Sequence, residues 1–193
     1  MNNLPEIEVS PGAILLLSGL IFFDRDGLLS ALVPAVIAHE LGHILAIAMT
    51  RGRISLLSFS SAGLRMDYLA PVDASSEIIM CMLGPVMGLI YAFAASNVGA
   101  VINSEYLLCS GGLSLVLSLY NLLPALPLDG GRILKIVLEQ LADFKAAKAV
   151  MFILSLLTGL ALSVAGVFYL ARGYGYALIP AGLWIMALSA KEV

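Results

Sequence analysis

Charged side chains are scarce in this chain. Asp, Glu, Lys and Arg make up 12% of its 193 residues, whereas they make up about a quarter of a soluble globular domain. Hydrophobic residues account for 61%, and the mean hydropathy is +1.01. This composition argues against a soluble domain and predicts an integral membrane protein. The sequence also lacks a basic patch of the kind that binds nucleic acid.

Cysteine and histidine are rare as well. The two cysteines, Cys81 and Cys109, both lie in apolar stretches, so we expect buried free thiols and no disulfide framework. Both histidines of the chain fall within one short stretch, "AHELGH", at residues 38–43. Any histidine-dependent site must therefore include this stretch.

Long apolar segments determine the predicted fold, because about 20 such residues cross a bilayer as a helix. We predict an α-helical polytopic membrane protein with about six transmembrane helices, at Val9–Phe23, Leu28–Met49, Glu77–Val101, Tyr106–Leu123, Ala146–Leu170 and Tyr176–Ala190. Basic residues gather after the second and fourth segments, and the positive-inside rule therefore predicts that both termini are cytoplasmic. The expected location is the cell membrane.

Two segments interrupt the helical pattern. Ile54–Phe59 and Leu64–Tyr68 alternate between apolar and polar residues, which is typical of a short membrane-associated β-hairpin or of an irregular interfacial loop. The other segment is "NLLPALPLDGGR", residues 121–132, in which Pro124 and Pro127 break the helix. Such backbone is tolerated at membrane depth only where it is buried in protein or lines a wet cavity.

The spacing of the two histidines indicates a metal site. Residues four positions apart on an α-helix lie on one face, about 6 Å apart along the axis, so His39 and His43 can hold one zinc ion. Glu40 lies next to the open coordination position, where it can accept a proton from a zinc-activated water. Three ionisable side chains are costly within one membrane helix, which favours this function over a packing role.

A catalytic zinc ion needs a third protein ligand, and the chain has no third histidine. Asp129 is the best acidic candidate, because it follows the proline-broken segment and precedes Gly130 and Gly131, which permit close backbone approach. On its own, Asp129 would more readily be a turn residue or a helix cap. Glu105 is a poorer candidate, since the charge pattern places it on the opposite side of the membrane.

These motifs together resemble the site-2 protease family of intramembrane zinc metalloproteases (M50). The resemblance rests on "HELGH" at residues 39–43 and "NLLPALPLDGG" at residues 121–131, and Gly84-Pro85 with Gly88 is similar to the family's Gly-Pro element. It covers about half of the chain.

The resemblance implies a role for each matching residue. His39, His43 and Asp129 would bind zinc, Glu40 would be the general base, and Asn121 would bind the substrate near the scissile bond. The implied activity is hydrolysis of peptide bonds in or near transmembrane segments of membrane proteins, as in regulated intramembrane proteolysis.

Within the family, the chain looks most like the sporulation branch that processes a sigma-factor precursor, but without that branch's CBS domain. The stretch from His43 to Asp129 is short and mostly apolar, which leaves no room for a PDZ domain. We therefore expect a single intramembrane metalloprotease domain over residues 1–193. Its partners would be the lipid bilayer and a membrane protein substrate, such as a sigma-factor precursor or an anti-sigma factor.

A substrate helix must be unwound locally before a peptide bond in it can be attacked. The predicted hairpin offers an edge to which the unwound segment can add as a strand, and we expect Ile54 and Leu56 to bind substrate there.

Two other functions use the same residues: a zinc or proton transporter, and a catalytically inactive protein that holds membrane clients. The gathering of polar groups at one depth disfavours a transporter, and the presence of Glu40 and every ligand disfavours an inactive binder. Serine and aspartyl intramembrane proteases fit poorly, since no further histidine and no Gly-x-Gly-Asp element exist.

Overall fold

The computed structural model describes residues 6–11, 24, 27–50, 53–60, 63–69, 73–173 and 175–189. Contacts divide the chain into two compact units, Met1–Ser118 and Leu119–Val193. Most of the first predicted span, residues 12–23, lies outside the described residues. Its first residue, Val9, ends a β-strand and not a helix. The single-domain organisation stays a prediction.

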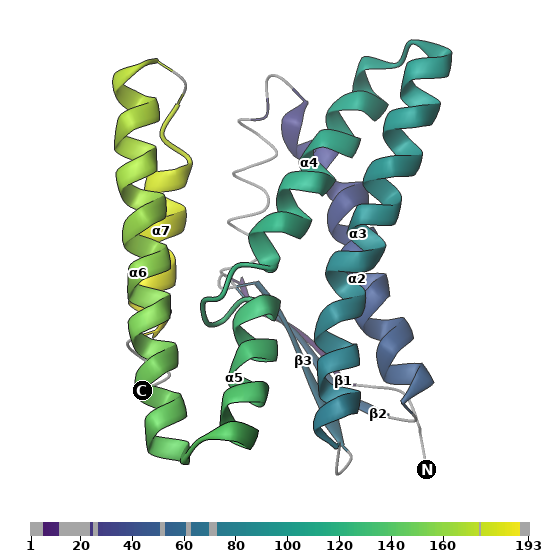
Figure 1. Cartoon of the computed structure of the whole chain (residues 1–193). Helices are drawn as coiled ribbons and strands as arrows, with labels where there is room; N and C mark the ends of the chain where they lie inside the picture. Colours follow the sequence, from purple (N-terminus) through teal and green to yellow (C-terminus); the bar gives the residue numbers. More distant parts are fainter. Residues whose placement is uncertain are drawn as a thin grey trace. The chain divides into compact units, whose positions relative to one another are not determined.

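Two long helices, α2 (Leu28–Met49) and α3 (Ala74–Ile102), pack against each other in the first unit (Figure 1). The bounds of α2 are those predicted from hydropathy. The Asp24 carboxylate accepts hydrogen bonds of 3.1 Å from the backbone N–H groups of Leu29 and Ser30. These N–H groups have no acceptor within the first turn of a helix, so the bonds stabilise the start of α2.

The next helix, α4 (Glu105–Asn121), follows α3 after Asn103, whose backbone is left-handed (φ 54°). The buried face of α4 consists of serine and glycine, including Ser110 and Ser114. The Ser114 hydroxyl donates a hydrogen bond of 2.8 Å to the Gly88 carbonyl of α3. Small residues let the two backbones approach closely, as is usual for helices that pack within a membrane.

The surface of the helices is mainly apolar. Phe93 is 74% exposed and Val101 is 80% exposed, while alanine, glycine and serine fill many buried positions. This is the reverse of a soluble protein and fits a surface that contacts lipid. The membrane prediction is therefore supported by the distribution of side chains as well as by composition.

Three helices of the described residues are long and apolar enough to cross a membrane: α2, α3 and α6 (Phe144–Ala171). By comparison, α4 has 17 residues, and the apolar α7 (Leu178–Ser189) has 12. The helices lie within a few residues of the predicted segments, but the count of six spans stays a prediction.

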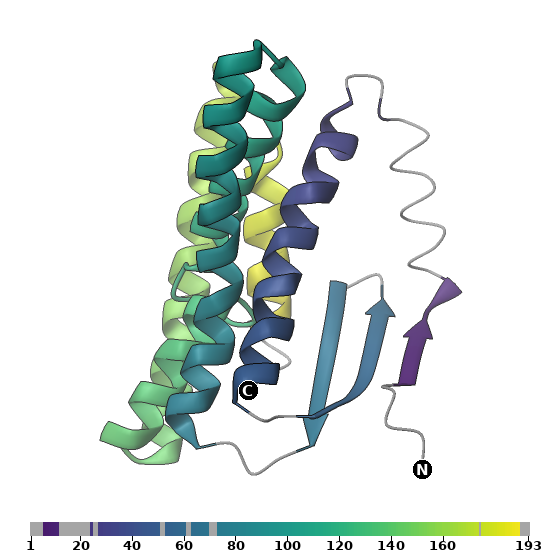
Figure 2. The same cartoon turned by 90° about the vertical axis from the view of Figure 1, so that its right-hand side faces the viewer.

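The first unit also contains a three-stranded sheet in the order β1 (Glu6–Val9), β2 (Arg53–Ser60) and β3 (Gly63–Leu69), which Figure 2 shows. β2 and β3 are antiparallel, with Ile54 opposite Tyr68. They overlap the two segments for which alternation predicts a hairpin, and residues 61–62 between them lie outside the described residues.

β1 was not predicted. It is parallel to β2, with Glu6 opposite Leu56 and Val9 opposite Phe59. Its four residues are too few for a reliable alternation signal, and its partner lies far along the chain. β2 is therefore the central strand of the sheet, and β1 and β3 are its two neighbours.

The second unit contains α5 (Asp129–Leu141), α6 and α7. α6 and α7 pack closely at Gly159 and Gly182, because a Cβ atom on Gly182 would lie only 2.4 Å from the Gly159 carbonyl oxygen. Ala125, Leu128 and Ile185 form the core of this unit. Backbone hydrogen bonds hold the segment before α5, which leads to Asp129.

Candidate metal centre

The first unit presents the two histidines of α2 as a pair. His39 is 5% exposed and His43 is half-buried. Their Nε2 atoms lie 3.1 Å apart, and their rings meet edge to face at an interplanar angle of 77°. Two nitrogen ligands of a tetrahedral zinc ion lie about 3.3 Å apart, given Zn–N distances of about 2.05 Å. The pair therefore fits a zinc ion with little movement.

The backbone of α3 fixes the tautomer of His43. The Nδ1 atom of His43 lies 2.7 Å from the Met80 carbonyl oxygen. A carbonyl can only accept a hydrogen bond, so Nδ1 carries the proton and Nε2 keeps its lone pair. This is the usual arrangement around a metal-binding histidine, whose second nitrogen donates to a carbonyl or carboxylate.

Glycines bring the histidine helix and α3 into contact. A Cβ atom on Gly84 would lie 2.2 Å from Nε2 of His43, and a Cβ atom on Gly42 would lie 2.2 Å from the Leu83 carbonyl oxygen. Real Cβ atoms do not approach other atoms so closely. Gly42 and Gly84 are therefore required for the close packing that places His43 against Met80.

Glu40 follows His39 on α2 and is half-buried. Its position in the helix is the one expected of a general base beside a pair of histidine ligands. The three polar side chains thus come from one helix, and α3 supports the second of the two histidines.

The second unit carries Asp129 as the first residue of α5, and its side chain is only 8% exposed. The segment before it is held by backbone hydrogen bonds from Ala125 to Leu123 (2.8 Å) and from Leu128 to Ala125 (2.9 Å). The Leu126 N–H also donates to the Ser155 hydroxyl of α6, at 2.9 Å. A buried serine thus ties the segment that presents Asp129 to a long helix.

The glycines after Asp129 allow this compact path. A Cβ atom on Gly130 would lie 2.2 Å from the Leu122 carbonyl oxygen, and one on Gly131 would lie 2.3 Å from the carbonyl group of Ala125. Asn121, the other residue implied by the motif, is the last residue of α4 and is half-buried.

Comparison with known proteins gives a family match that includes the second of these two motifs. The model of Peptidase family M50 matches residues 78–165, a range that includes Gly84, Asn121 and Asp129. In overall structure the chain is similar to the site-2 protease from Methanocaldococcus jannaschii, with a TM-score of 0.71 and 24% identity over 96% of this chain and 89% of that one. Over residues 78–165 the chain is therefore similar to Peptidase family M50, and its fold is that of a site-2 protease.

A curated protein is similar to part of the chain. It is a Synechocystis sp. (strain ATCC 27184 / PCC 6803 / Kazusa) protein described as a zinc metalloprotease, 35% identical over 127 residues. The match covers 60% of this chain and 32% of the relative, so the chain spans about a third of that relative's length.

The predicted site residues are therefore distributed over both units. His39, Glu40 and His43 belong to the first unit, where the structure brings the histidines together. Asn121 and Asp129 belong to the second unit. Both lie within the family match, whereas "HELGH" lies before it.

The remaining predicted residues, Ile54 and Leu56, lie on β2. Leu56 has neighbours on both sides, Glu6 of β1 and Asp67 of β3. The β1 pairing begins at Leu56 and does not include Ile54.

Two contacts of the site were missed by sequence reasoning. One is Met80, whose carbonyl orients His43. Because the acceptor is backbone, the identity of residue 80 carries no signal of this role. Ser155 was not singled out at all. A single serine position within the apolar α6, which also contains Ser163, is a weak signal, although serines commonly bond across helices in membranes.

Proposed function

We propose that this chain is an intramembrane zinc metalloprotease, which hydrolyses peptide bonds in or near the transmembrane segments of membrane proteins. The observation that carries the proposal is the histidine pair, with Nε2 atoms 3.1 Å apart and His43 held by the Met80 carbonyl. The similarity to Peptidase family M50 over residues 78–165 and the three long apolar helices of the described residues support it.

His39, His43 and Asp129 would hold one zinc ion per chain, because each offers one ligand atom and a catalytic zinc site has three protein ligands. Zinc, when bound, would act as a Lewis acid and lower the pKa of water to about 7. Glu40 would take a proton from the attacking water and deliver it to the leaving amine. His43 is oriented by the Met80 carbonyl, so it would need little rearrangement to bind the ion.

The substrate would be a transmembrane or membrane-associated protein that is locally unwound at the site. Its extended backbone would add to β2 near Ile54, where pairing with β1 has not yet begun, and not at Leu56, which is paired on both sides. Asn121 would hold the substrate backbone through its side-chain amide. A sigma-factor precursor and an anti-sigma factor are the substrates to assay first.

The proposed setting is the cell membrane, which the chain would cross several times with both termini in the cytoplasm. The distribution of basic residues supports this orientation. Cysteine labelling at Glu8, which is exposed, would test it. Labelling of a Glu8→Cys variant by an impermeant reagent in intact cells would contradict a cytoplasmic N-terminus, once Cys81 and Cys109 are replaced by serine.

The function is tested by measuring zinc content and cleavage in the same preparations. Wild type, Glu40→Gln and Asp129→Ala are purified in detergent, and bound zinc is counted before incubation with single-span substrates. We expect one zinc per chain in wild type and Glu40→Gln, less zinc in Asp129→Ala, and cleavage by wild type alone. Glu40→Gln is the matched variant, because it keeps the size of the side chain and removes only the base.

Each other result has a defined meaning. Full zinc content in Asp129→Ala would remove this residue from the ligand set. Cleavage by Glu40→Gln at the wild-type rate would remove the general base. Zinc binding and zinc flux into vesicles, without cleavage of any substrate, would contradict the protease and favour a transporter.

The contribution of β2 is tested separately with Ile54→Pro. Proline removes a backbone donor and disfavours strand addition, so we expect slower cleavage with unchanged zinc content. Cleavage at the wild-type rate would exclude strand addition at this position.

A further inference from the structure

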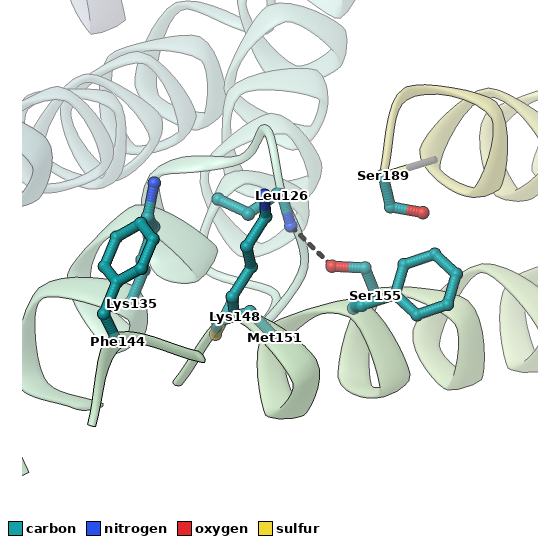
Figure 3. Close-up of a pocket in the computed structure, with 8 residues that line it drawn as sticks. Leu126, Lys135, Phe144, Lys148, Met151, Ser155 and Ser189 are labelled. Atoms are coloured by element: carbon teal, nitrogen blue, oxygen red, sulfur yellow. Dashed lines mark hydrogen bonds between the residues drawn. The ribbon is translucent and has the colours of Figure 1, made fainter. Parts of the chain in front are cut away.

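A small cavity opens in the second unit among α5, α6 and the end of α7, with a volume of about 80 Å³ (Figure 3). Lys135 of α5 and Lys148 of α6 line it together with Phe144, Met151 and Phe152. The cavity is much smaller than the roughly 300–1,000 Å³ typical of sites for drug-sized ligands. It would therefore accept a small chemical group and not a whole metabolite.

The two lysines give the cavity a positive charge. Both are half-buried, and Figure 3 shows both side chains extending toward the segment that carries Leu126. No carboxylate is among the residues that line the cavity in the described part of the chain. Two ammonium groups that line one cavity from two helices are suited to a small anion, since each can donate several charge-assisted hydrogen bonds.

The apolar part of the lining indicates what carries the anion. Met151 is buried, and the rings of Phe144 and Phe152 border the same cavity. Lys148 is the fifth residue of α6, so it lies about 6 Å along the helix from its first residue. In a membrane-spanning helix this depth is close to the interface, where lysine side chains meet lipid head groups.

We propose that Lys135 and Lys148 bind the phosphate group of an anionic phospholipid, whose acyl chains lie along the apolar surface of α6. A soluble phosphate ester would offer the same phosphate anion as the phospholipid. The apolar lining and the interfacial depth favour the lipid as the source. This inference does not depend on the protease activity, because it concerns binding alone.

The cavity also borders the segment that precedes Asp129. Ser155 lines the cavity and accepts the hydrogen bond from the Leu126 N–H. Leu126 itself is part of the lining. A lipid head group held here would therefore contact the segment that leads to Asp129.

The test compares lipid retention in variants with the same change of net charge. Protein is exchanged into bicelles of phosphatidylcholine with phosphatidylglycerol, and the bound phosphatidylglycerol is measured by native mass spectrometry after detergent extraction. Lys145 provides the matched control, because it lies on the same helix, is exposed and does not line the cavity. Lys135→Gln and Lys148→Gln should each weaken retention about fivefold, and Lys145→Gln should change it less than twofold.

Two competing ligands identify the source of the anion, and one further variant controls for folding. Glycerol phosphate added in solution should not displace the lipid, and an anionic lipid without phosphate, such as oleate, should be retained more weakly. Lys148→Arg should restore retention because it keeps the charge, and this separates loss of the site from loss of folding.

Equal losses in the Lys145 and Lys148 variants would overturn the proposal, because the lipid would then respond only to surface charge. Displacement by glycerol phosphate would overturn the lipid as the source. Equal retention of oleate would overturn phosphate recognition.

Discussion

Replacing Gly84 with alanine tests whether the contact between α2 and α3 determines metal binding. The new Cβ atom would lie 2.2 Å from Nε2 and 2.4 Å from Cε1 of His43, whereas ordinary van der Waals contact begins near 3.4 Å. The ring or the helix must therefore move by about 1.2 Å, the difference between these distances. Metal sites tolerate deviations of only about 0.2 Å in ligand distance.

A displacement of this size would also break the hydrogen bond of 2.7 Å between His43 and the Met80 carbonyl. Loss of a partner behind a metal ligand typically weakens metal binding 10–100-fold. We expect Gly84→Ala to lose at least this much zinc affinity, because it moves the ligand as well as its partner. Competition with a zinc chelator, followed by measurement of the bound metal, gives the affinity.

Gly112→Ala is the matched control. It makes the same substitution in another apolar helix, and a Cβ atom on Gly112 would meet nothing within 4 Å. Its zinc affinity should equal that of wild type, and helix content by circular dichroism should be unchanged in both variants. Wild-type zinc affinity in Gly84→Ala would refute the reasoning, since His43 would then bind metal without the close approach of α3.

Three further predictions follow from contacts outside the histidine pair. Ser155→Ala leaves the buried N–H of Leu126 without its acceptor and should lower the free energy of unfolding by about 1–3 kcal/mol, measured by denaturant titration in detergent, with Ser163→Ala of the same helix as control. Gly182→Ala places a Cβ atom 2.4 Å from the Gly159 carbonyl oxygen and should destabilise the α6–α7 pair by about 1–3 kcal/mol; an unchanged melting temperature would contradict this. Hydrogen bonds from the Ser75 and then the Ser76 hydroxyl lower the pKa of Asp73 at the start of α3 below its usual 3.8, so any stability that the charged carboxylate gives is present above the unfolded pKa and is lost as pH falls through the lowered folded pKa. An NMR titration should show this lowered pKa, and Ser75→Ala should raise it.

Most helices could be predicted because each depends mainly on its own sequence. The apolar run Leu28–Met49 gave the bounds of α2 directly, and Pro124 and Pro127 predicted the break between α4 and α5. The approach of His39 and His43 follows from helix geometry alone, so the sequence was sufficient to place these two side chains on one face.

Contacts between distant segments could not be predicted in the same way. β1 pairs with a strand that lies far along the chain, and its four residues have no distinctive pattern. The Met80 contact uses a backbone carbonyl, and the role of Gly84 depends on how closely two helices approach. Resemblance to the family drew attention to Gly84, but the physical reason for glycine there required the position of His43.

The hydrogen bond from His43 to Met80 has a consequence for folding. In a zinc finger the metal orders the ligands, so that removing it unfolds the domain. Here α2 and α3 already hold the His43 imidazole through contacts that involve no metal. The metal would therefore bind a scaffold whose helices are already formed, so zinc would add to the stability of the protein without being required for its folding. Chelation should accordingly be reversible, with the helices of the metal-free protein intact and ready to take up zinc again without refolding.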